Sequence, residues 1–273
     1  MSPRAPAALF SQLLFWTDLF VLAHFASSSE VGVYAAAVRA AQVILLFLIS
    51  VNYVFSPFVA DLHARGERDR LDALFKSLTR WMLTATLPIF IVLAVAPGTA
   101  LRLFGEGFGA GRTALLILLA GQLVNVATGS VGFILIMVGR TGVDLVVNAA
   151  AVALSAGSAA VLVPRYGMEG AAVAGAVALA LSNLARLILV WRHLRIQPFT
   201  RDYLRLAIPA GIGALAGWLA HVLVRSGGWQ ADLAITAVVA TIAYGAALIA
   251  AGLPARERAA ALGLLSAVVR RSK

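Results

Sequence analysis

The sequence has no cysteine and few charges, and both absences narrow what the chain can be. Without cysteine there are no disulfides, no thiolate metal sites and no cysteine nucleophile. Only 12% of the 273 residues are charged, against about 25% in a soluble domain. Apolar residues make up 61% of the chain and the mean hydropathy is +0.92. This composition excludes a soluble globule and indicates a protein that has lipid as its solvent.

Catalytic and nucleotide-binding signatures are absent as well. Histidine occurs four times, scattered along the chain, with no HExxH and no Ser-His-Asp grouping. The glycine-rich stretch FGEGFGAGR (104–112) lacks the GxxxxGK[ST] pattern of a phosphate-binding loop and follows no strand, so it is expected to be a turn. The sequence therefore predicts a transporter without cofactor or metal, and not an enzyme.

Long apolar runs predict an all-α fold, a polytopic membrane helical bundle of about eight transmembrane helices. The expected spans cover residues 7–25, 33–60, 81–103, 113–138, 143–163, 171–191, 206–224 and 231–252. Pro88 and Pro97 predict that the third span is bent. Residues 61–80 have helical apolar spacing and are expected to form an amphipathic lead-in to it. The tail, 254–273, is expected to lie on the membrane as a basic amphipathic helix.

Lysine and arginine are distributed unevenly between the predicted loops. If successive spans cross the membrane in alternating directions, sixteen of the 22 Lys and Arg residues fall on the side of the two termini and four on the other. Arg39 and Arg186 lie inside spans. By the positive-inside rule both termini are cytoplasmic. The basic loops would face anionic membrane lipids, which makes the net charge of +10 a sign of topology and not of nucleic-acid binding.

Two charges interrupt the first two spans at matching depth. Asp18 and Arg39 are equidistant from the middle of a polar segment, Ser27–Glu30, that is expected to be a tight turn. A charge at a helix centre costs about 3 kcal/mol on insertion scales, so each needs a partner or a wet cavity. One interpretation is a structural ion pair. The other is a cavity in which Arg39 holds an anionic group and Asp18 orients it or binds a proton or cation.

Further polar side chains form stripes on the predicted spans, which lipid would not tolerate. The residues expected to face a substrate cavity are Arg39, Asp18, Gln42, Tyr53, Gln122, Asn125 and Asn148. The alternative for the amides is interhelical hydrogen bonding, which is worth about 0.6 kcal/mol per pair. Asp144 and Arg186, near the ends of their spans, are expected to snorkel to the membrane surface.

Several segments, in order, carry a resemblance to a known family. They are VGVYAAAVRAAQ (31–42), SVNYVFSPFVADLHARGERDRL (50–71), LFGEGFGAG (103–111), LLAGQLVNVATGSVGFILIMVGRTG (118–142) and VPRYGMEGAAVAGAVA (163–178). Together they resemble bacterial polysaccharide (O-antigen-type) flippases of the multidrug/oligosaccharidyl-lipid/polysaccharide exporter superfamily. The resemblance implies that 1–193 is a six-helix second lobe, 194–253 an additional helix pair and 254–273 a cytoplasmic tail. A first lobe has no counterpart in the sequence, so the chain is expected to need one.

The resemblance also implies a function. Such proteins move polyprenyl-pyrophosphate-linked oligosaccharides across the bacterial inner membrane by alternating access, and cationic cavity residues meet the pyrophosphate. Arg39 is the position that matches such a residue. Two alternatives stay open: a cation-coupled multidrug exporter of the same fold, which predicts a cavity of carboxylates and aromatic residues, and a truncated remnant that does not transport.

Overall fold

The computed structural model describes residues 4–224 and 228–252, and this part of the chain is all α-helical. In chain order its helices are α1 (Arg4–Phe25), α2 (Ser28–Gln42), α3 (Leu45–Ala64), α4 (Arg68–Val95), α5 (Pro97–Leu101), the 3-10 turns Arg102–Phe104 and Glu106–Gly111, α6 (Arg112–Thr128), α7 (Val131–Met137), α8 (Thr141–Leu194), α9 (Arg201–Arg205), α10 (Ala207–Val224), α11 (Trp229–Ala247) and the π-helix Leu248–Gly252. The predicted tail at 254–273 lies outside the described residues.

Six helical segments of the described chain are long and apolar enough to cross a membrane. They are Leu45–Ala64, Arg68–Val95, Glu106–Thr128, Thr141–Leu194, Tyr203–Val224 and Trp229–Ala251. The predicted fold class, an all-α membrane bundle, is confirmed at this level. The longest segment contains two of the spans that the sequence predicts, 143–163 and 171–191, as the two arms of one kinked helix.

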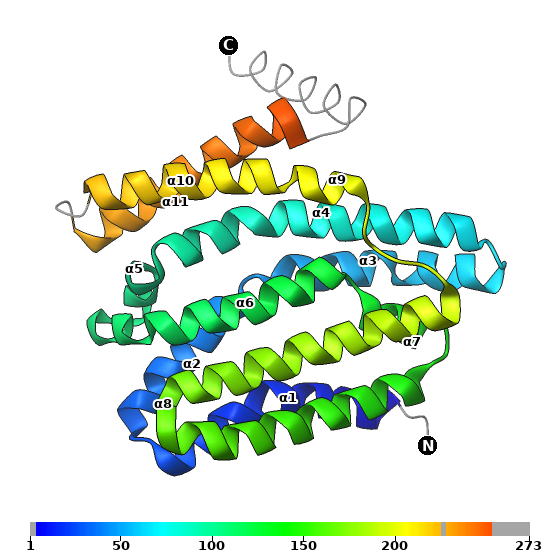
Figure 1. Cartoon of the computed structure of the whole chain (residues 1–273), viewed down its shortest axis with the longest axis horizontal. Helices are drawn as coiled ribbons and strands as arrows, with labels where there is room; N and C mark the ends of the chain where they lie inside the picture. The colour runs from blue at the N-terminus through cyan, green and yellow to red at the C-terminus, as the bar shows by residue number, and fades with distance from the viewer. Residues whose placement is uncertain (1–3, 225–227, 253–273) are drawn as a thin grey trace. The chain divides into compact units, whose positions relative to one another are not determined.

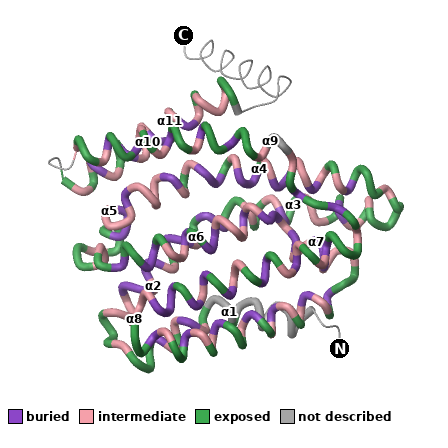
Figure 2. The backbone as a smooth tube through the Cα atoms, viewed as in Figure 1, coloured by how far each residue is buried: buried purple, intermediate pink, exposed green. Residues whose placement is uncertain are grey.

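Backbone contacts divide the chain into two units. One comprises residues 1–86 and 97–198, and there α8 packs against α1, α6 and α7, while α2 packs on α6 (Figure 1). Buried residues recur along α2, α6 and α8, among exposed and half-buried ones (Figure 2). The other unit comprises 87–96 and 199–273, where α10 and α11 form a helix pair. The predicted lobe boundary at residue 193 stays a prediction.

The second predicted span, 33–60, is two helices and not one. α2 ends at Gln42 and α3 begins at Leu45, although Val43 and Ile44 both keep right-handed helical dihedral angles. The junction is a tightened turn, in which the Val43 amide donates to the Ala40 carbonyl at 3.3 Å and the Leu46 amide to the Val43 carbonyl at 3.2 Å. Hydrogen bonds between residues three apart, as in a 3-10 helix, wind the backbone more tightly than an α-helix, and this turn separates α2 from α3.

The fourth predicted span, 113–138, is also broken, here by a glycine. α6 ends at Thr128, and Gly129 follows with φ 71° and ψ −159°, a backbone region that only glycine occupies readily. A Cβ at this position would also lie 2.3 Å from the Thr79 hydroxyl oxygen. The short helix α7 therefore starts afresh at Val131.

The expected turn Ser27–Glu30 is shorter than predicted, because the helix begins inside it. Ser27 is the N-cap of α2 and its hydroxyl oxygen accepts from the Glu30 amide at 3.3 Å. The Glu30 carboxylate in turn accepts from the Met168 amide at 3.0 Å, just after Gly167, which has φ 52° and kinks α8. Glu30 thereby caps the second arm of α8 and ties it to α2.

The third predicted span, 81–103, is shifted toward the amino terminus. α4 starts at Arg68, so the expected lead-in and the span form one helix that includes Pro88. The helix ends at Val95, and Pro97 starts the short α5, which places the predicted bend at the second proline. The glycine-rich stretch 104–112 is a connection of 3-10 turns, as predicted.

Candidate functional site: an arginine groove beside a buried aspartate

A groove of about 360 Å³ opens at the junction between α2 and α3. It is lined by residues of α1, α2 and α3: Trp16, Leu19, Ala35, Val38, Arg39, Gln42, Leu45, Leu46 and Ile49. Its volume lies in the range of small-molecule sites. Leu45, Leu46 and Ile49 at the start of α3 line the groove beside Arg39 and Gln42 at the end of α2.

Arg39 is the charged group of the groove, and its side chain is exposed. Its guanidinium carbon lies 5.4 Å from the centre of the Trp16 ring, a distance that permits a cation–π interaction. One guanidinium nitrogen donates to the side-chain oxygen of Gln42 at 3.5 Å, a long hydrogen bond. Most N–H donors of the Arg39 guanidinium stay available for an anion, which a guanidinium can bind through two parallel hydrogen bonds.

Asp18 lies close by but is not the partner of Arg39. Its carboxylate is 4% exposed and accepts from the Tyr34 hydroxyl at 2.5 Å and from the Leu19 amide at 2.9 Å. A Cβ at Gly175 would come within 2.5 Å of it, so α8 covers it closely. The structural ion pair suggested by the matching depths is therefore wrong. Tyr34 and Arg39 are five residues apart, about 140° around the helix, and only Tyr34 faces Asp18.

A second, smaller cavity of about 30 Å³ adjoins the Asp18 carboxylate, with room for about one water molecule. Val38 and Gln42 line both this cavity and the groove. Gln122 lines the small cavity too, and its side-chain oxygen accepts from Asn125 at 3.1 Å. The structure thus brings five of the predicted polar residues into one region. Arg39 and Gln42 line the groove, Gln42, Asp18 and Gln122 line the small cavity, and Asn125 is bonded to Gln122.

Tyr53 lies apart from this region. It is expected from the sequence to face the same cavity as Arg39, on a span predicted over 33–60, but the junction at 43–44 divides that span into two helices. Its side chain is 74% exposed, and its ring centre lies 6.4 Å from that of Phe133 on α7. Tyr53 does not line the groove.

Asn148 belongs to a different polar cluster, which the sequence analysis missed. It joins Asp144, Ser182 and Arg186 on the two arms of α8, all at most 8% exposed. The Arg186 guanidinium donates to Asp144 at 2.8 Å, to Asn148 at 2.6 Å and to Ser182 at 3.2 Å. The Asn148 amide donates to the other Asp144 oxygen at 3.0 Å, which closes the network.

This network corrects the expectation that Asp144 and Arg186 snorkel. Both side chains stay inside the bundle, where each neutralises the other, and Gly132 of α7 lies against them with its Cβ position 3.5 Å from Arg186. The spacing of these residues in the sequence is the signal that indicates the network. Asn148 and Arg186 are each 19 residues from Gly167, and both Asp144–Asn148 and Ser182–Arg186 are four apart. Four residues is the spacing of neighbours on one helix face.

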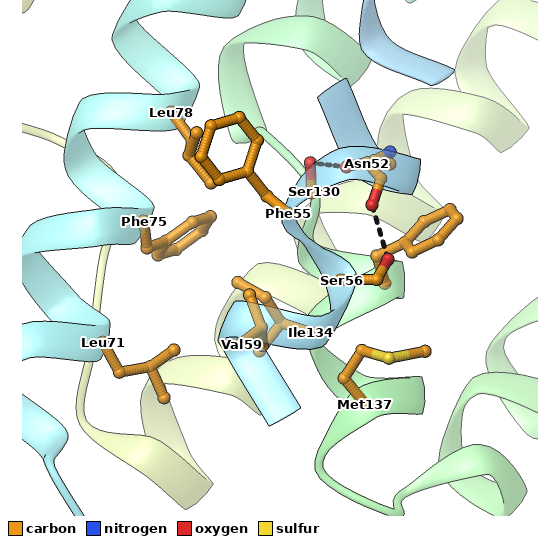
Figure 3. Close-up of a pocket in the computed structure, with 11 residues that line it drawn as sticks. Asn52, Phe55, Ser56, Val59, Leu71, Phe75, Leu78, Ser130, Ile134 and Met137 are labelled. Atoms are coloured by element: carbon orange, nitrogen blue, oxygen red, sulfur yellow. Dashed lines mark hydrogen bonds between the residues drawn. The ribbon is translucent and has the colours of Figure 1, made fainter. Parts of the chain in front are cut away.

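A third cavity, of about 20 Å³, lies between α3, α4 and α7 (Figure 3). Ser130 donates to the side-chain oxygen of Asn52, and Phe75, Val59 and Ile134 surround the pair with apolar groups. Asn52 thus makes a hydrogen bond that links α3 to the start of α7. With so little space, this is a packing joint and not a ligand site.

Comparison with known proteins assigns the chain to a family. A family model described as MatE matches residues 3–161, more than half of the chain. The chain belongs to the MatE family. A probable low-salt glycan biosynthesis flippase, Agl15, from Haloferax volcanii is 24% identical over 170 residues, which cover 62% of this chain and 36% of that protein. The chain thus spans about a third of the length of this relative. No solved structure matches this chain.

The MatE family consists of membrane transporters and is not enzymatic, which confirms that part of the sequence prediction. The matched residues include the whole groove and the part of the Asp18 cavity that α1, α2 and α6 form. Gly175, Ala176 and Leu179 of that cavity lie beyond them, as does Arg186. Among the described residues, no group of three or more His, Asp or Glu side chains has the arrangement of a metal site. The chemistry that this MatE chain offers is therefore that of a cationic, partly apolar groove.

Proposed function

We propose that the chain takes part in moving polyprenyl-pyrophosphate-linked oligosaccharides across a membrane for the synthesis of cell-surface polysaccharide, of which O-antigen is one kind. The observation that carries the proposal is the exposed Arg39 guanidinium in a groove that is otherwise mostly apolar. An amphiphile with an anionic headgroup would match both the guanidinium and the apolar lining of this groove. The relative named as a glycan biosynthesis flippase supports the same substrate class.

In this proposal the chain is the second lobe of a two-lobe transporter with about eight spans, residues 1–193 and a helix pair at 194–253. A first lobe would complete the cavity opposite Arg39. Rocking of the lobes would expose the site to either side of the membrane in turn. The basic loops would face anionic lipids on the cytoplasmic side of a bacterial inner membrane, with both termini on that side.

Arg39 would hold the pyrophosphate by charge-assisted hydrogen bonds, for which a planar guanidinium is better suited than an ammonium. The contact with Trp16 holds the guanidinium at the mouth of the groove without using up its donors. The alternative of a cation-coupled multidrug exporter predicts a carboxylate-lined cavity. The charge lining this groove is instead that of Arg39, while Asp18 is buried behind it, and this favours an anionic substrate.

The test is replacement at the chromosomal locus, where the chain has its natural partners. Arg39→Ala is expected to reduce surface glycan strongly, and Arg39→Lys to reduce it partly, because an ammonium retains the charge but loses the fork. The matched control is Arg102→Ala, an exposed arginine outside the groove, which should leave surface glycan unchanged. Normal glycan in the Arg39→Ala strain, with the variant protein present at the wild-type level, would contradict the proposal.

A further inference from the structure

The connection between α4 and α6 exposes two large apolar side chains. Leu103 and Phe104, in the 3-10 turn Arg102–Phe104, are 65% and 46% exposed. Two of the segments that can cross a membrane, Arg68–Val95 and Glu106–Thr128, flank this connection. Because it lies between the ends of two such segments, the connection is at the level of a membrane surface, where water, headgroups and acyl chains meet.

This connection has a fixed position relative to the first turns of α2. A Cβ at Gly111 would lie 2.9 Å from a methyl carbon of Val33, so the two segments are in close contact. The connection also folds onto itself, since a Cβ at Gly109 would lie 3.4 Å from the Gly98 carbonyl oxygen. The two exposed side chains are therefore presented by a compact segment that is packed on α2.

Two further exposed aromatic side chains lie at the same end of the unit that holds α2, α6 and α8 (Figure 1). Phe25, which is 53% exposed, ends α1 two residues before the Ser27 N-cap of α2. Tyr166, which is 61% exposed, comes two residues before Met168, whose amide donates to Glu30 at 3.0 Å. Three separate segments thus bring an exposed aromatic side chain to the first turns of α2.

Aromatic side chains at one level are typical of the boundary between water and acyl chains. Tyrosine suits this boundary because it has an apolar ring and a polar tip, as Tyr166 does. Phe25, Leu103 and Phe104 have no polar tip and suit the first carbons of the acyl chains. The first turn of α2 exposes two serines instead, which suit the side of the headgroups and water.

We propose that Leu103 and Phe104 insert into the membrane below the lipid headgroups and anchor α2 at a fixed depth. Phe25 and Tyr166 complete the anchor at the same level. The partner of this surface is the bilayer itself, and an apolar face of this kind lies about 5–10 Å into the boundary between headgroups and acyl chains. The inference does not depend on the substrate proposed for the groove.

The anchor has a consequence for the groove. Arg39 comes nine residues after Glu30, which is about 14 Å along α2. Because the anchored segments meet the first turns of α2, Arg39 lies at most about 14 Å below this level. The hydrocarbon core of a bilayer is about 30 Å thick, so the groove lies no deeper than about its middle.

The test is a measurement of depth, which the absence of cysteine makes direct, since one introduced cysteine carries one probe. The purified full-length chain is placed in vesicles of phosphatidylcholine and phosphatidylglycerol, with an environment-sensitive fluorophore on Leu103→Cys or, separately, on Phe104→Cys. Lipids with a doxyl quencher near the headgroup should quench both probes more strongly than lipids with the quencher at the end of the acyl chain. Iodide in the water should quench neither probe.

Two control positions calibrate the depth. Glu106→Cys is at an exposed side chain in the same connection, and its probe should be quenched by iodide and not by the lipids. Leu154→Cys is at a side chain of α8 that is 41% exposed, thirteen residues and about 20 Å along the helix from Gly167. Its probe should be quenched most by the lipids that carry the quencher at the end of the acyl chain.

Three outcomes would overturn the inference. Quenching of the Leu103 and Phe104 probes by iodide alone would place both side chains in water. Protection from iodide and from both lipids would show that another polypeptide, such as a first lobe or a second copy, covers this surface. The strongest quenching by the acyl-chain end, as expected for Leu154, would place the connection too deep for an anchor. If one of the two cysteine variants is not recovered as a monodisperse protein, the other decides.

Discussion

Arg39 and Arg186 both lie on helices of this chain, and their surroundings differ. Arg186 is 8% exposed, is paired with Asp144 and donates to two further side chains. Arg39 is exposed, makes one long hydrogen bond to Gln42 and stacks on Trp16. The Arg186 guanidinium donates its hydrogen bonds to side chains of the same protein, whereas most donors of the Arg39 guanidinium remain available. The comparison separates a charge that holds helices together from a charge that is available to a ligand.

The same contrast applies to the two aspartates. Asp144 accepts from a guanidinium and an amide, so its charge is compensated inside the bundle. Asp18 accepts from a hydroxyl and a backbone amide, both neutral, and lies next to a small cavity. Burying a charge is costly unless it is paired and hydrogen-bonded. The closed network is therefore expected to govern stability, and the open region to govern binding.

The largest effect is expected from breaking the closed network. Arg186→Ala should destabilise the chain by about 3–5 kcal/mol, because it leaves the Asp144 carboxylate buried without its counter-charge. The measurement is the thermal unfolding midpoint in detergent. Arg39→Ala is the matched control and should stay within about 0.5 kcal/mol of the unchanged chain, since its side chain is exposed.

A double variant sharpens this test. Asp144→Asn combined with Arg186→Met removes both charges, and it should lose much less stability than Arg186→Ala alone, because no unpaired charge remains. Equal losses in the single and double variants would show that the packing of Arg186, and not its charge, stabilises the arms of α8.

A smaller loss is expected at Asp18. Asp18→Ala leaves the buried Tyr34 hydroxyl without its acceptor and should cost about 1–3 kcal/mol of stability. Asp18→Asn retains an oxygen acceptor in the same place and should cost clearly less. Glu106→Ala, at an exposed acid in a 3-10 turn, serves as the control. If Asp18→Ala melts at the same temperature as the unchanged chain, the bond to Tyr34 contributes nothing to folding.

The sequence was informative about where polar residues occur and uninformative about how helices rotate. Equal spacing from a turn was used for Asp18 and Arg39, and it fails there because Tyr34, and not Arg39, points at Asp18. The same argument applied to Asn148 and Arg186 would have succeeded, since both lie 19 residues from Gly167 and meet at 2.6 Å. Equal spacing sets depth alone, and contact also requires the correct rotation about the helix axis.

The helix breaks show a second limit. The break after α6 has a local cause, because Gly129 adopts dihedral angles that other residues avoid. The break after α2 has none, because Val43 and Ile44 are apolar and keep helical angles. No glycine or proline marks this junction, although the groove opens at it. The sequence predicts one span over 33–60 with Arg39, Gln42 and Tyr53 facing one cavity, whereas Arg39 and Gln42 line the groove and Tyr53 does not.

The smallest expected effect tests how Arg39 is held. Trp16→Leu removes the ring beneath the guanidinium and should weaken binding of undecaprenyl phosphate by about two- to fivefold, since a cation–π contact at an exposed site contributes about 0.5–1 kcal/mol. The control is Trp191→Leu, which removes an equivalent contact, because Arg195 lies 5.4 Å from the centre of that ring. The two variants lose the same kind of interaction, but only Trp16 lines the groove. Equal weakening by both would mean that the loss is a general effect on the fold, and that Arg39 needs no support from Trp16 to bind an anion.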